Sequence, residues 1–323
     1  MKKTNFINIY LQLFIIYIQI FSIKNDSNLK IINNKIFNYK NENIYYDNNI
    51  VSKFLYNNVK IFCLILTGPQ YITSRVNYQK ETWLNRCNDF LYVSSLSNIS
   101  LPSIGVDVVE GRDTLWEKIR YGIEYVYKYY FNNYDWFLLI DDDSYVFMEN
   151  LRFFLLSKNS NNLLHYGFRM KDLKSTIKEG YIQGGSGDVL SKMVLKKLVN
   201  IGFKNDSICK KYSDNSGDVE LGECLSNIGI KIGESRDFLS RLTFIPGPPD
   251  AFTGVSDNSI YKSFNKLSYY MFKRGHNMYI IEYLLYQANV FGRQSTFNYN
   301  ITRNKINDDY LKKLLYKKLN NNL

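Results

Sequence analysis

The chain has 323 residues, enough for one large domain or two small ones, and 45% of them are hydrophobic, which allows a sizeable core. Lysine and arginine number 41 against 30 acidic residues, which gives a formal net charge of +11. These basic residues are spread along the chain beside Asn, Ile, Tyr and Phe, and no helix-turn-helix, zinc-finger or RNP-type motif accompanies them, so we expect no nucleic-acid partner.

The N-terminus combines a positive flank with an apolar run. Lys2 and Lys3 precede the mostly apolar residues 6–23, which just reach the length of a membrane-spanning helix. Such a pattern is typical of a signal peptide or an uncleaved signal anchor. Because no small-x-small cleavage site follows, we favour an uncleaved signal anchor over a cleaved signal peptide. The anchor would comprise residues 1–23, and the rest of the chain would lie in the lumen of the secretory pathway.

Four cysteines occur, Cys63, Cys87, Cys209 and Cys224, without the C-x-x-C pairs that zinc sites favour, and they allow three complete pairings. Cys63 lies within the apolar run 61–66, so we predict a buried small hydrophobic residue there. Cys209 and Cys224 flank a polar loop and could close it with a disulfide in an oxidising compartment.

Four Asn-x-Ser/Thr sequons begin at Asn25, Asn98, Asn205 and Asn300. Sequons are acceptors for N-glycosylation, but an Asn-rich chain produces them by chance, so they add little support for secretion.

Strands and helices alternate after a polar N-terminal stretch. Residues 24–58 are rich in Asn, Lys and Tyr without a sustained period, as in a stem that tethers a domain. We expect the domain itself over 59–295 and a basic tail over 296–323. Hydrophobic spacing and turn residues predict strands at 60–66, 90–94, 106–109 and 136–140, and helices at 78–86 and 114–131. This alternation predicts an α/β fold with a parallel sheet covered on both faces, which binds ligands at the carboxyl ends of its strands.

Three consecutive carboxylates follow the continuously apolar strand at 136–140. Asp141, Asp142 and Asp143 repel one another, so a fold tolerates them only with a neutralising partner. Mg²⁺ and Mn²⁺ favour carboxylate oxygens and can bridge to a diphosphate, and Asp141 and Asp143 can face one ion because alternate residues of an extended segment share a side. A solvated acidic turn is the alternative, but the position at the end of a buried strand favours a metal site.

The segment around these aspartates resembles the core 1 β1,3-galactosyltransferase family, a group of the fringe-like β3-glycosyltransferases. Residues 135–151 carry the match, from Asp-Trp-Phe-Leu through Asp-Asp-Asp-Ser-Tyr-Val to Glu-Asn-Leu. Further blocks agree in the same order, and so many ordered blocks are more specific than any single motif. These blocks are 66–70, 82–83, 86–88, 110–113 with Leu115 and Lys118, 166–167 with Arg169 and Lys171, 184–187, 189–191, 218–222, 224–225, 234–237, 278–279, 282–284 and Tyr286.

The resemblance implies a GT-A fold, in which a nucleotide-sugar-binding sheet is joined to an acceptor-binding half, and transfer with inversion in one displacement. Asp141 and Asp143 would hold Mn²⁺ against the diphosphate of a UDP-sugar, and Asp218 would deprotonate the acceptor 3-hydroxyl as the catalytic base. Gly184 and Gly185 would form a loop against the sugar. The implied nucleotide contacts are Leu66, Thr67, Glu110, Gly111, Arg112, Lys118, Asp141 and Asp142.

Donor, acceptor and location also follow from the resemblance. It implies UDP-galactose as donor, GalNAc on Ser or Thr of a glycoprotein as acceptor, and a single-pass type II protein of the Golgi membrane whose catalytic domain is lumenal. A homodimer is compatible with it. The alternatives are a fringe-like transferase of another UDP-sugar and a non-catalytic, chaperone-like relative that assists a transferase. Retention of Asp141, Asp143 and Asp218 favours the enzyme.

Several positions depart from the family pattern. Gly217 stands where the family has the glutamate of a Glu-Asp motif. The family's histidine metal ligand, in a Ser-Phe-His-Tyr segment, has no counterpart in 263–270, and His276 is the nearest candidate, although a lone histidine is more often a packing residue. Residues 246–257 are short and proline-rich where the family has a longer aromatic stretch that helps to hold the acceptor, which leaves the acceptor open. His165 has no matching role, and we expect it to pack in the core.

Overall fold

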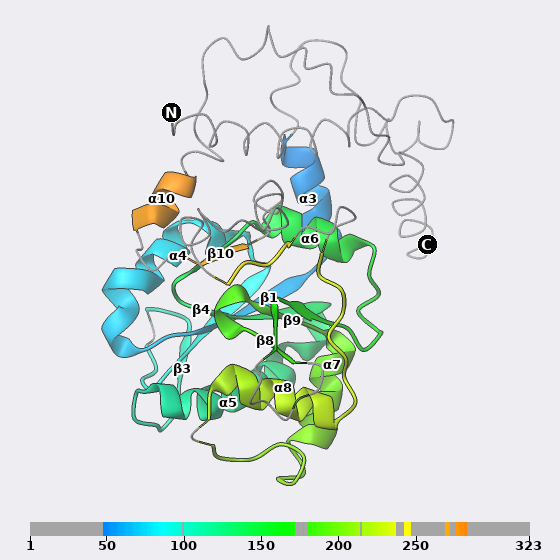
Figure 1. The fold of residues 1–323 in the computed structure, drawn as a ribbon. Helices are drawn as coiled ribbons and strands as arrows, with labels where there is room; N and C mark the ends of the chain where they lie inside the picture. The colour runs from blue at the N-terminus through cyan, green and yellow to red at the C-terminus, as the bar shows by residue number, and fades with distance from the viewer. Residues whose placement is uncertain are drawn as a thin grey trace, which may run out of the picture.

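A six-stranded sheet lies at the centre of the molecule (Figure 1). The structure is a computed structural model that describes residues 48–98, 100–171, 177, 180–213, 215–236, 242–246, 269–271 and 276–282. The strands are β1 Ile61–Leu66, β2 Asp89–Ser94, β3 Ser103–Gly105, β4 Trp136–Asp141, β6 His165–Gly167 and β9 Asp188–Ser191. In the order β3-β2-β1-β4-β9-β6, the first four strands are parallel, and β9 runs antiparallel to both β4 and β6. The predicted α/β fold is present, but its sheet is mixed rather than wholly parallel.

Two short strand pairs adjoin the main sheet. Strand β5, Ser144–Val146, follows the aspartates directly and pairs antiparallel with β10, Tyr269–Met271. Strand β7, Arg169–Met170, pairs antiparallel with β8, Tyr181–Ile182. The turn that carries the aspartates is thus held between β4 of the main sheet and β5 of the first small pair.

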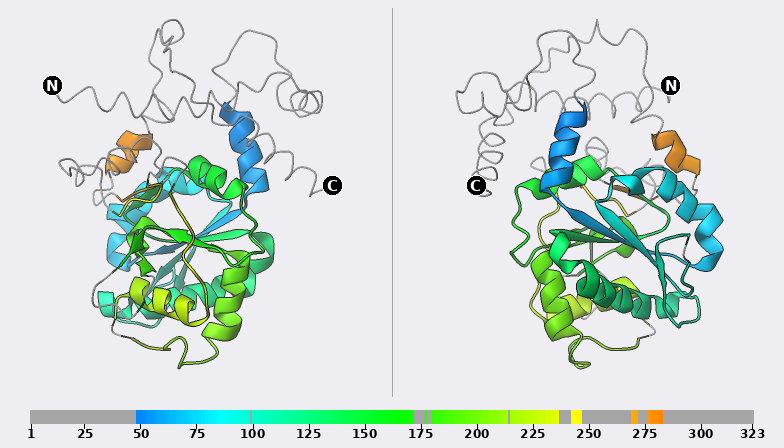
Figure 2. Two further views of the ribbon diagram at one scale, coloured as in Figure 1. Left: turned by 45° about the vertical axis from the view of Figure 1, so that its right-hand side comes forward. Right: turned by 180° about the vertical axis from the view of Figure 1, so that it is seen from behind.

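The central strands feed two separate cores because successive side chains of a strand point to opposite faces. Ile61, Cys63 and Ile65 are buried in one core, and Phe62 and Leu64 in the other. Helices α3 and α6 cover the first face with the helical turns of 69–86, and α5, α7 and α8 cover the second (Figure 2). The helices are α3 Asn48–Asn58, α4 Asn77–Glu81, α5 Leu115–Tyr130, α6 Met148–Leu156, α7 Lys192–Lys197, α8 Gly217–Asn227 and α10 His276–Glu282. The shorter helical turns are η1 Pro69–Tyr71, η2 Ile72–Val76, η3 Trp83–Arg86, η4 Arg112–Thr114, η5 Phe131–Asn133, η6 Gly184–Ser186 and η7 Leu198–Gly202.

Most of the predicted elements are present, with two corrections. The strands predicted at 60–66, 90–94 and 136–140 are β1, β2 and β4, and the helix predicted at 114–131 is α5. The strand predicted at 106–109 is wrong, because the edge strand β3 ends before it and Val109 is 83% exposed. The helix predicted at 78–86 is interrupted at Thr82, whose ψ of −110° breaks the helical path between α4 and η3.

Helix α3 lies inside the range predicted as a stem. Leu55 and Val59 are buried in the core that α3 shares with α6, and Ser52 Oγ donates to Glu149 Oε1 at 3.3 Å. Folded structure therefore begins before residue 59. The predicted signal anchor at 1–23 and tail at 296–323 lie outside the described residues, and no helix within the described ranges is long and apolar enough to cross a bilayer.

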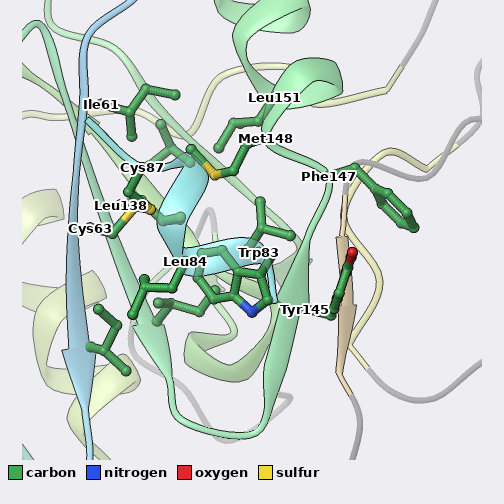
Figure 3. Packing of buried hydrophobic residues seen from close by; sticks show 14 of the residues in the cluster. Ile61, Cys63, Trp83, Leu84, Cys87, Leu138, Tyr145, Phe147, Met148 and Leu151 are labelled. Atoms are coloured by element: carbon green, nitrogen blue, oxygen red, sulfur yellow. A yellow bond between two sulfur atoms is a disulfide. The ribbon is translucent and has the colours of Figure 1, made fainter. Parts of the chain in front are cut away.

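Both cysteine pairs form disulfides. Cys63 of β1 is joined to Cys87, and Cys209 is joined to Cys224 of α8. Cys63 is buried, as predicted, but it is a disulfide partner rather than a lone hydrophobic residue. The reason is that η3 carries the chain back over β1 and brings Cys87 beside it, next to the buried Trp83 (Figure 3). The predicted link between Cys209 and Cys224 is present.

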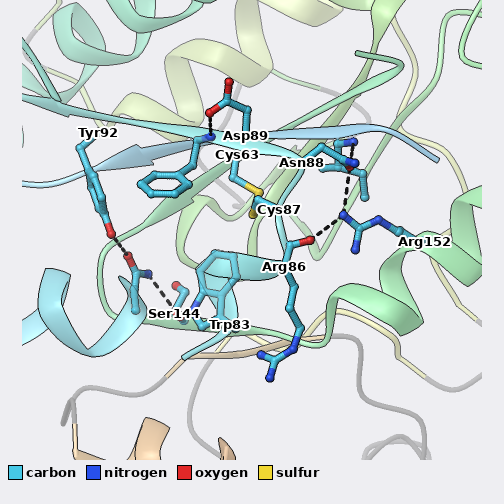
Figure 4. The surroundings of a disulfide bond; sticks show 12 residues. Cys63, Trp83, Arg86, Cys87, Asn88, Asp89, Tyr92, Ser144 and Arg152 are labelled. Carbon is cyan, nitrogen blue, oxygen red and sulfur yellow. Dashed lines mark hydrogen bonds between the residues drawn. A yellow bond between two sulfur atoms is a disulfide. The ribbon is translucent and has the colours of Figure 1, made fainter. Parts of the chain in front are cut away.

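Two arginines fix the segments around the first disulfide. Arg152 of α6 donates to the Arg86 carbonyl at 2.6 Å and to Asn88 Oδ1 at 3.0 Å (Figure 4). The Arg86 side chain pairs in turn with Glu282 of α10, with one contact at 3.0 Å, and the Tyr145 hydroxyl donates to Glu282 at 2.7 Å. These bonds attach α10 to η3 and to β5, the strand that follows the aspartates.

Candidate active site

The three aspartates occupy the point where two central parallel strands end. Asp141 is the last residue of β4 and lies opposite Leu66, the last residue of β1. Because parallel strands end at the same edge of a sheet, the residue after β1 can reach the turn after β4. Thr67 does so, since its hydroxyl donates to Asp142 Oδ2 at 2.7 Å. The structure therefore brings the predicted residues of both strands together at the carboxyl edge.

Arg75 is a neighbour of this cluster that sequence reasoning missed. Its Nη1 donates to Asp142 Oδ1 at 2.9 Å and lies 3.4 Å from Asp143 Oδ2. Its guanidinium also stacks on Tyr71, 4.0 Å from the ring centroid. With Thr67 on one oxygen and Arg75 on the other, both Asp142 oxygens are engaged within the protein. A lone arginine in η2 carries no motif, so only the folded arrangement reveals this pairing.

Burial and mutual repulsion raise the pKa values of the cluster. The pKa of Asp141 is raised to about 7, and burial is the largest cause of this shift. The negative charges of its neighbours add to this shift, in the order Asp143, Asp142 and Asp218. Burial also raises the pKa of Asp142 to about 6, although the hydrogen bond from Arg75 opposes the shift. This edge of the sheet is thus short of positive charge, a deficit that a divalent cation would remove.

Lys118 and Glu110 form an ion pair beside the end of β1. The Lys118 Nζ lies 2.9 and 3.1 Å from the two Glu110 oxygens and donates to the Thr67 carbonyl. The Ser95 N–H, just after β2, donates to Glu110 at 2.9 Å. Burial alone would raise the pKa of Glu110, but the hydrogen bonds from Lys118 and Ser95 outweigh it and lower that pKa. The pair therefore ties the chain before α5 to the ends of β1 and β2.

The remaining predicted nucleotide residues differ in exposure. Leu66 is buried at the strand end, whereas Gly111 and Arg112 are exposed. A Cβ at Gly111 would meet only the Asp113 nitrogen, at 4.0 Å, so the space beside this backbone is open. An exposed guanidinium next to open backbone suits an anionic ligand.

Asp218 is brought to the same edge by α8. It lies in the first turn of this helix, where the macrodipole favours a negative charge, and its charge contributes to the raised pKa of Asp141. The Gly184 N–H donates to Asp218 Oδ2 at 3.3 Å, and the Val219 N–H and the Ser216 hydroxyl donate to Oδ1. Asp218, the glycine loop and the aspartates after β4 therefore meet in the folded chain.

Two glycines near Asp218 are explained by close packing. The Gly185 carbonyl accepts from Ser144 Oγ at 3.0 Å, which joins the glycine loop to β5. A Cβ at Gly217 would lie 2.7 Å from Ile119 Cδ1 and 3.2 Å from Leu115 Cβ. At position 217, where the family has glutamate, a larger side chain would therefore require a shift between α8 and α5.

The donor set at this edge fits a hard divalent cation. Asp141 and Asp143, which flank the engaged Asp142, would supply the carboxylate oxygens. In the part of the chain that the structure describes, no three His, Cys, Asp or Glu side chains form a group that could hold a metal ion. The side chain of His276 and the predicted acceptor loop beyond Pro246 lie outside the described residues.

His165 packs in the core, as predicted. It is buried in β6, and its Nε2 lies 2.6 Å from the Oδ1 of Asp188, which is also buried. The pair joins β6 to β9, which are three and two strands away from β1 in the sheet order.

Relatives of the chain are found across most of its length. A family model described as Fringe-like matches residues 56–318. The glycoprotein-N-acetylgalactosamine 3-beta-galactosyltransferase 1 of Xenopus laevis is 33% identical over 279 residues, which cover 81% of this chain and 76% of that protein. The beta-1,3-glucosyltransferase of Mus musculus is 24% identical over 180 residues, which cover 55% of this chain and 36% of that protein.

A solved structure shares a more distant likeness. It is titled as a glycosyltransferase involved in the glycosylation of the major capsid of PBCV-1, and it has a TM-score of 0.38, 12% identity, and coverage of 68% of this chain and 99% of its own. The family match and the Xenopus relative suffice: the chain belongs to the Fringe-like family, in its core 1 β1,3-galactosyltransferase group, and is a glycosyltransferase.

Proposed function

We propose that the chain is a metal-dependent, inverting galactosyltransferase that moves galactose from UDP-galactose to the 3-hydroxyl of GalNAc on Ser or Thr. The observation that carries the proposal is the meeting of Asp141, Asp143 and Asp218 at one sheet edge, in a chain whose Xenopus relative is named as such a galactosyltransferase. The mixed sheet with four parallel strands supports a GT-A-type nucleotide-binding half. The product would be the β1,3-linked disaccharide of core 1 O-glycans.

The site residues divide into complementary roles. Asp141 and Asp143 would hold Mn²⁺, which supplies neutralisation of the charge on the departing diphosphate. Asp218 would accept the proton of the acceptor hydroxyl on the face opposite the leaving UDP. Gly184 and Gly185 would let the sugar approach closely, because they present no side chain.

The nucleotide would lie over the end of β1. Leu66 and Thr67 would line the uracil side, and the Lys118–Glu110 pair would hold that backbone in place through the Thr67 carbonyl. Asp142 would take part by fixing Thr67 rather than by binding the ion. The exposed segment of Gly111 and Arg112 would offer its backbone and charge to the nucleotide.

Location in the secretory pathway completes the proposal. Residues 1–23 would anchor the chain in the Golgi membrane with the domain in the lumen. Two disulfides among the described residues support an oxidising compartment, because cytosolic thiols are kept reduced.

Transfer of a different UDP-sugar is the second candidate function. A mouse beta-1,3-glucosyltransferase is among the relatives, and the proline-rich stretch at 246–257 is shorter than the acceptor-holding segment of the family. This candidate keeps the same metal, nucleotide and base residues and changes only the sugar and the acceptor.

The test is a donor and acceptor screen with the detergent-solubilised full chain. UDP release is measured with UDP-galactose, UDP-glucose and UDP-N-acetylglucosamine, Mn²⁺ and a GalNAc-bearing peptide, and the product linkage is determined by NMR. We expect galactose in β1,3 linkage to GalNAc. Preference for another donor would support the second candidate. Absence of both transfer and UDP binding would contradict either activity and favour a chaperone-like relative.

A further inference from the structure

In two of the four sequons the asparagine and the serine are described residues, and in both the same two hydrogen bonds join them. In the loop between β2 and β3, Asn98 Oδ1 accepts from the Ser100 N–H at 3.0 Å and from the Ser100 hydroxyl at 2.7 Å. In the loop between η7 and α8, at the bottom of Figure 1, Asn205 Oδ1 accepts from the Ser207 N–H at 3.0 Å and from its hydroxyl at 2.7 Å. The third residue of each sequon thus holds the carboxamide of the first through its hydroxyl.

These hydrogen bonds leave the amide nitrogen of each asparagine available. Both donors of the serine engage Oδ1, so Nδ2 is the side of the carboxamide directed away from the serine. Within the described ranges, neither the Asn98 nor the Asn205 Nδ2 has a hydrogen-bond partner. Asn205 and both serines are exposed, and Asn98 is partly exposed. A bulky group on either nitrogen would therefore project into solvent without disturbing the core.

Besides an accessible asparagine, N-glycosylation requires that the chain enter the compartment where N-glycans are added. Cys63–Cys87 and Cys209–Cys224 are disulfides, which form in the oxidising lumen where N-glycans are added. We propose that Asn98 and Asn205 are N-glycosylation sites that receive an oligosaccharide from a lipid-linked diphosphate donor. The inference rests on the secretory location put forward under Proposed function.

The reaction needs only the asparagine carboxamide and the lipid-linked oligosaccharide. The Asn Nδ2 forms a bond to the anomeric carbon of the first sugar and loses a proton to solvent, while the bond from that carbon to the lipid diphosphate oxygen breaks. The lipid diphosphate leaves with the electron pair of that bond. No oxidant, reductant or residue of the transferase site takes part.

The surroundings of Asn205 give a glycan a physical role. Ile201 and Tyr212, on either side of this sequon in the sequence, are 48% and 68% exposed. Cys209, which follows the sequon, carries the disulfide that attaches this loop to α8. A glycan at Asn205 would screen these apolar side chains from other molecules and so favour solubility.

The experiment uses the full chain expressed in a eukaryotic secretory host, with Asn25→Gln and Asn300→Gln introduced so that only two sequons remain. Peptide-N-glycosidase treatment reports total glycan by gel mobility, and mass spectrometry reports conversion of each asparagine to aspartate. Ser100→Ala and Ser207→Ala each remove one sequon, whereas Ser100→Thr and Ser207→Thr keep it. Asn200→Gln, an exposed asparagine outside any sequon, is the matched control.

We expect two mobility steps in the parent, one in each alanine variant, and two in each threonine variant and in the control. Retention of both steps in one alanine variant would overturn the assignment of that asparagine. Absence of modification in a protein whose disulfides have formed would overturn the inference and leave the proposed transferase activity standing. Reduced cysteines together with unmodified sequons would contradict both the inference and the lumenal location.

Discussion

Arg75 is the cation that faces the aspartates after β4, and its removal should expose how much the cluster depends on it. Arg75→Gln deletes the ion pair to Asp142 and leaves a buried carboxylate without its charged partner, so we expect a loss of about 1–3 kcal/mol in the free energy of unfolding. Arg75→Lys keeps the charge without the planar fork and should lose less. Thermal unfolding in EDTA measures both. Lys204→Gln, which changes an exposed cation, is the control, and an unchanged melting temperature in Arg75→Gln would contradict the assignment.

Asp218 is expected to act on the acceptor and not on the nucleotide. Asp218→Asn keeps the shape of the side chain but removes its basicity, so kcat should fall by about 10²-fold or more, while the dissociation constant for UDP stays near that of the wild type. Initial rates and isothermal titration separate the two effects. A variant that keeps wild-type kcat would exclude Asp218 as the base.

Glu110 gives a pH dependence whose sign is fixed by its lowered pKa. Its folded-state pKa lies below the ordinary value of 4.5, so its contribution to stability is complete above pH 4.5 and is lost as the pH falls through the folded-state pKa. Glu110→Gln should therefore show a shallower loss of stability on the acid side than the wild type. Urea unfolding over a pH series measures this difference, and parallel curves would contradict it.

Gly122 sets how closely helix α5 approaches the sheet. A Cβ at this position would lie 2.8 Å from Val93 Cγ2 and 3.1 Å from Leu64 Cδ2, both buried. Gly122→Val should therefore destabilise the protein by about 1–3 kcal/mol or more through overpacking. Lys128→Val places the same side chain on the exposed face of α5 and controls for helix propensity. Equal urea midpoints for the two variants would contradict close packing at Gly122.

Elements with strong local patterns were predictable, and those decided by tertiary contacts were not. The apolar runs of β1 and β4 identify strands buried on both faces, and the spacing of 114–131 identifies α5. The edge strand β3 was misplaced because its Ser-Ile-Gly sequence has little hydrophobic pattern and depends on pairing with β2. The break at Thr82 likewise reflects the need of Trp83 to reach the core, where its indole N–H donates to the Ser144 carbonyl.

The edge of the sheet at which β1 and β4 end explains how much of the candidate site could be predicted from the sequence. Asp141 and Asp143 were predictable because they follow a buried strand directly, and Asp218 only because a family motif marks it. The contact of Thr67 with Asp142 follows from the parallel pairing of β1 and β4. Arg75 could not be predicted, because its position depends on the path of η2 over the strand ends.

The two disulfides also differ in how far the sequence alone predicts them. Burial of Cys63 was evident from its apolar neighbours, but its pairing depends on η3, which returns the chain over β1. Cys209 and Cys224 flank one loop, so their proximity could be read from the sequence.

The proposed transfer reaction depends most on a divalent ion held between the aspartates after β4 and the diphosphate of UDP. Isothermal titration of UDP into the full chain, with Mn²⁺ and with EDTA, tests this directly, with Asp143→Ala as the variant and Asp107→Ala, an exposed carboxylate, as the control. We expect Mn²⁺ to tighten UDP binding at least about tenfold in the wild type and in the control, and to have no effect in Asp143→Ala. Equal affinities with Mn²⁺ and EDTA in the wild type, or a metal effect that survives in Asp143→Ala, would contradict the proposed reaction.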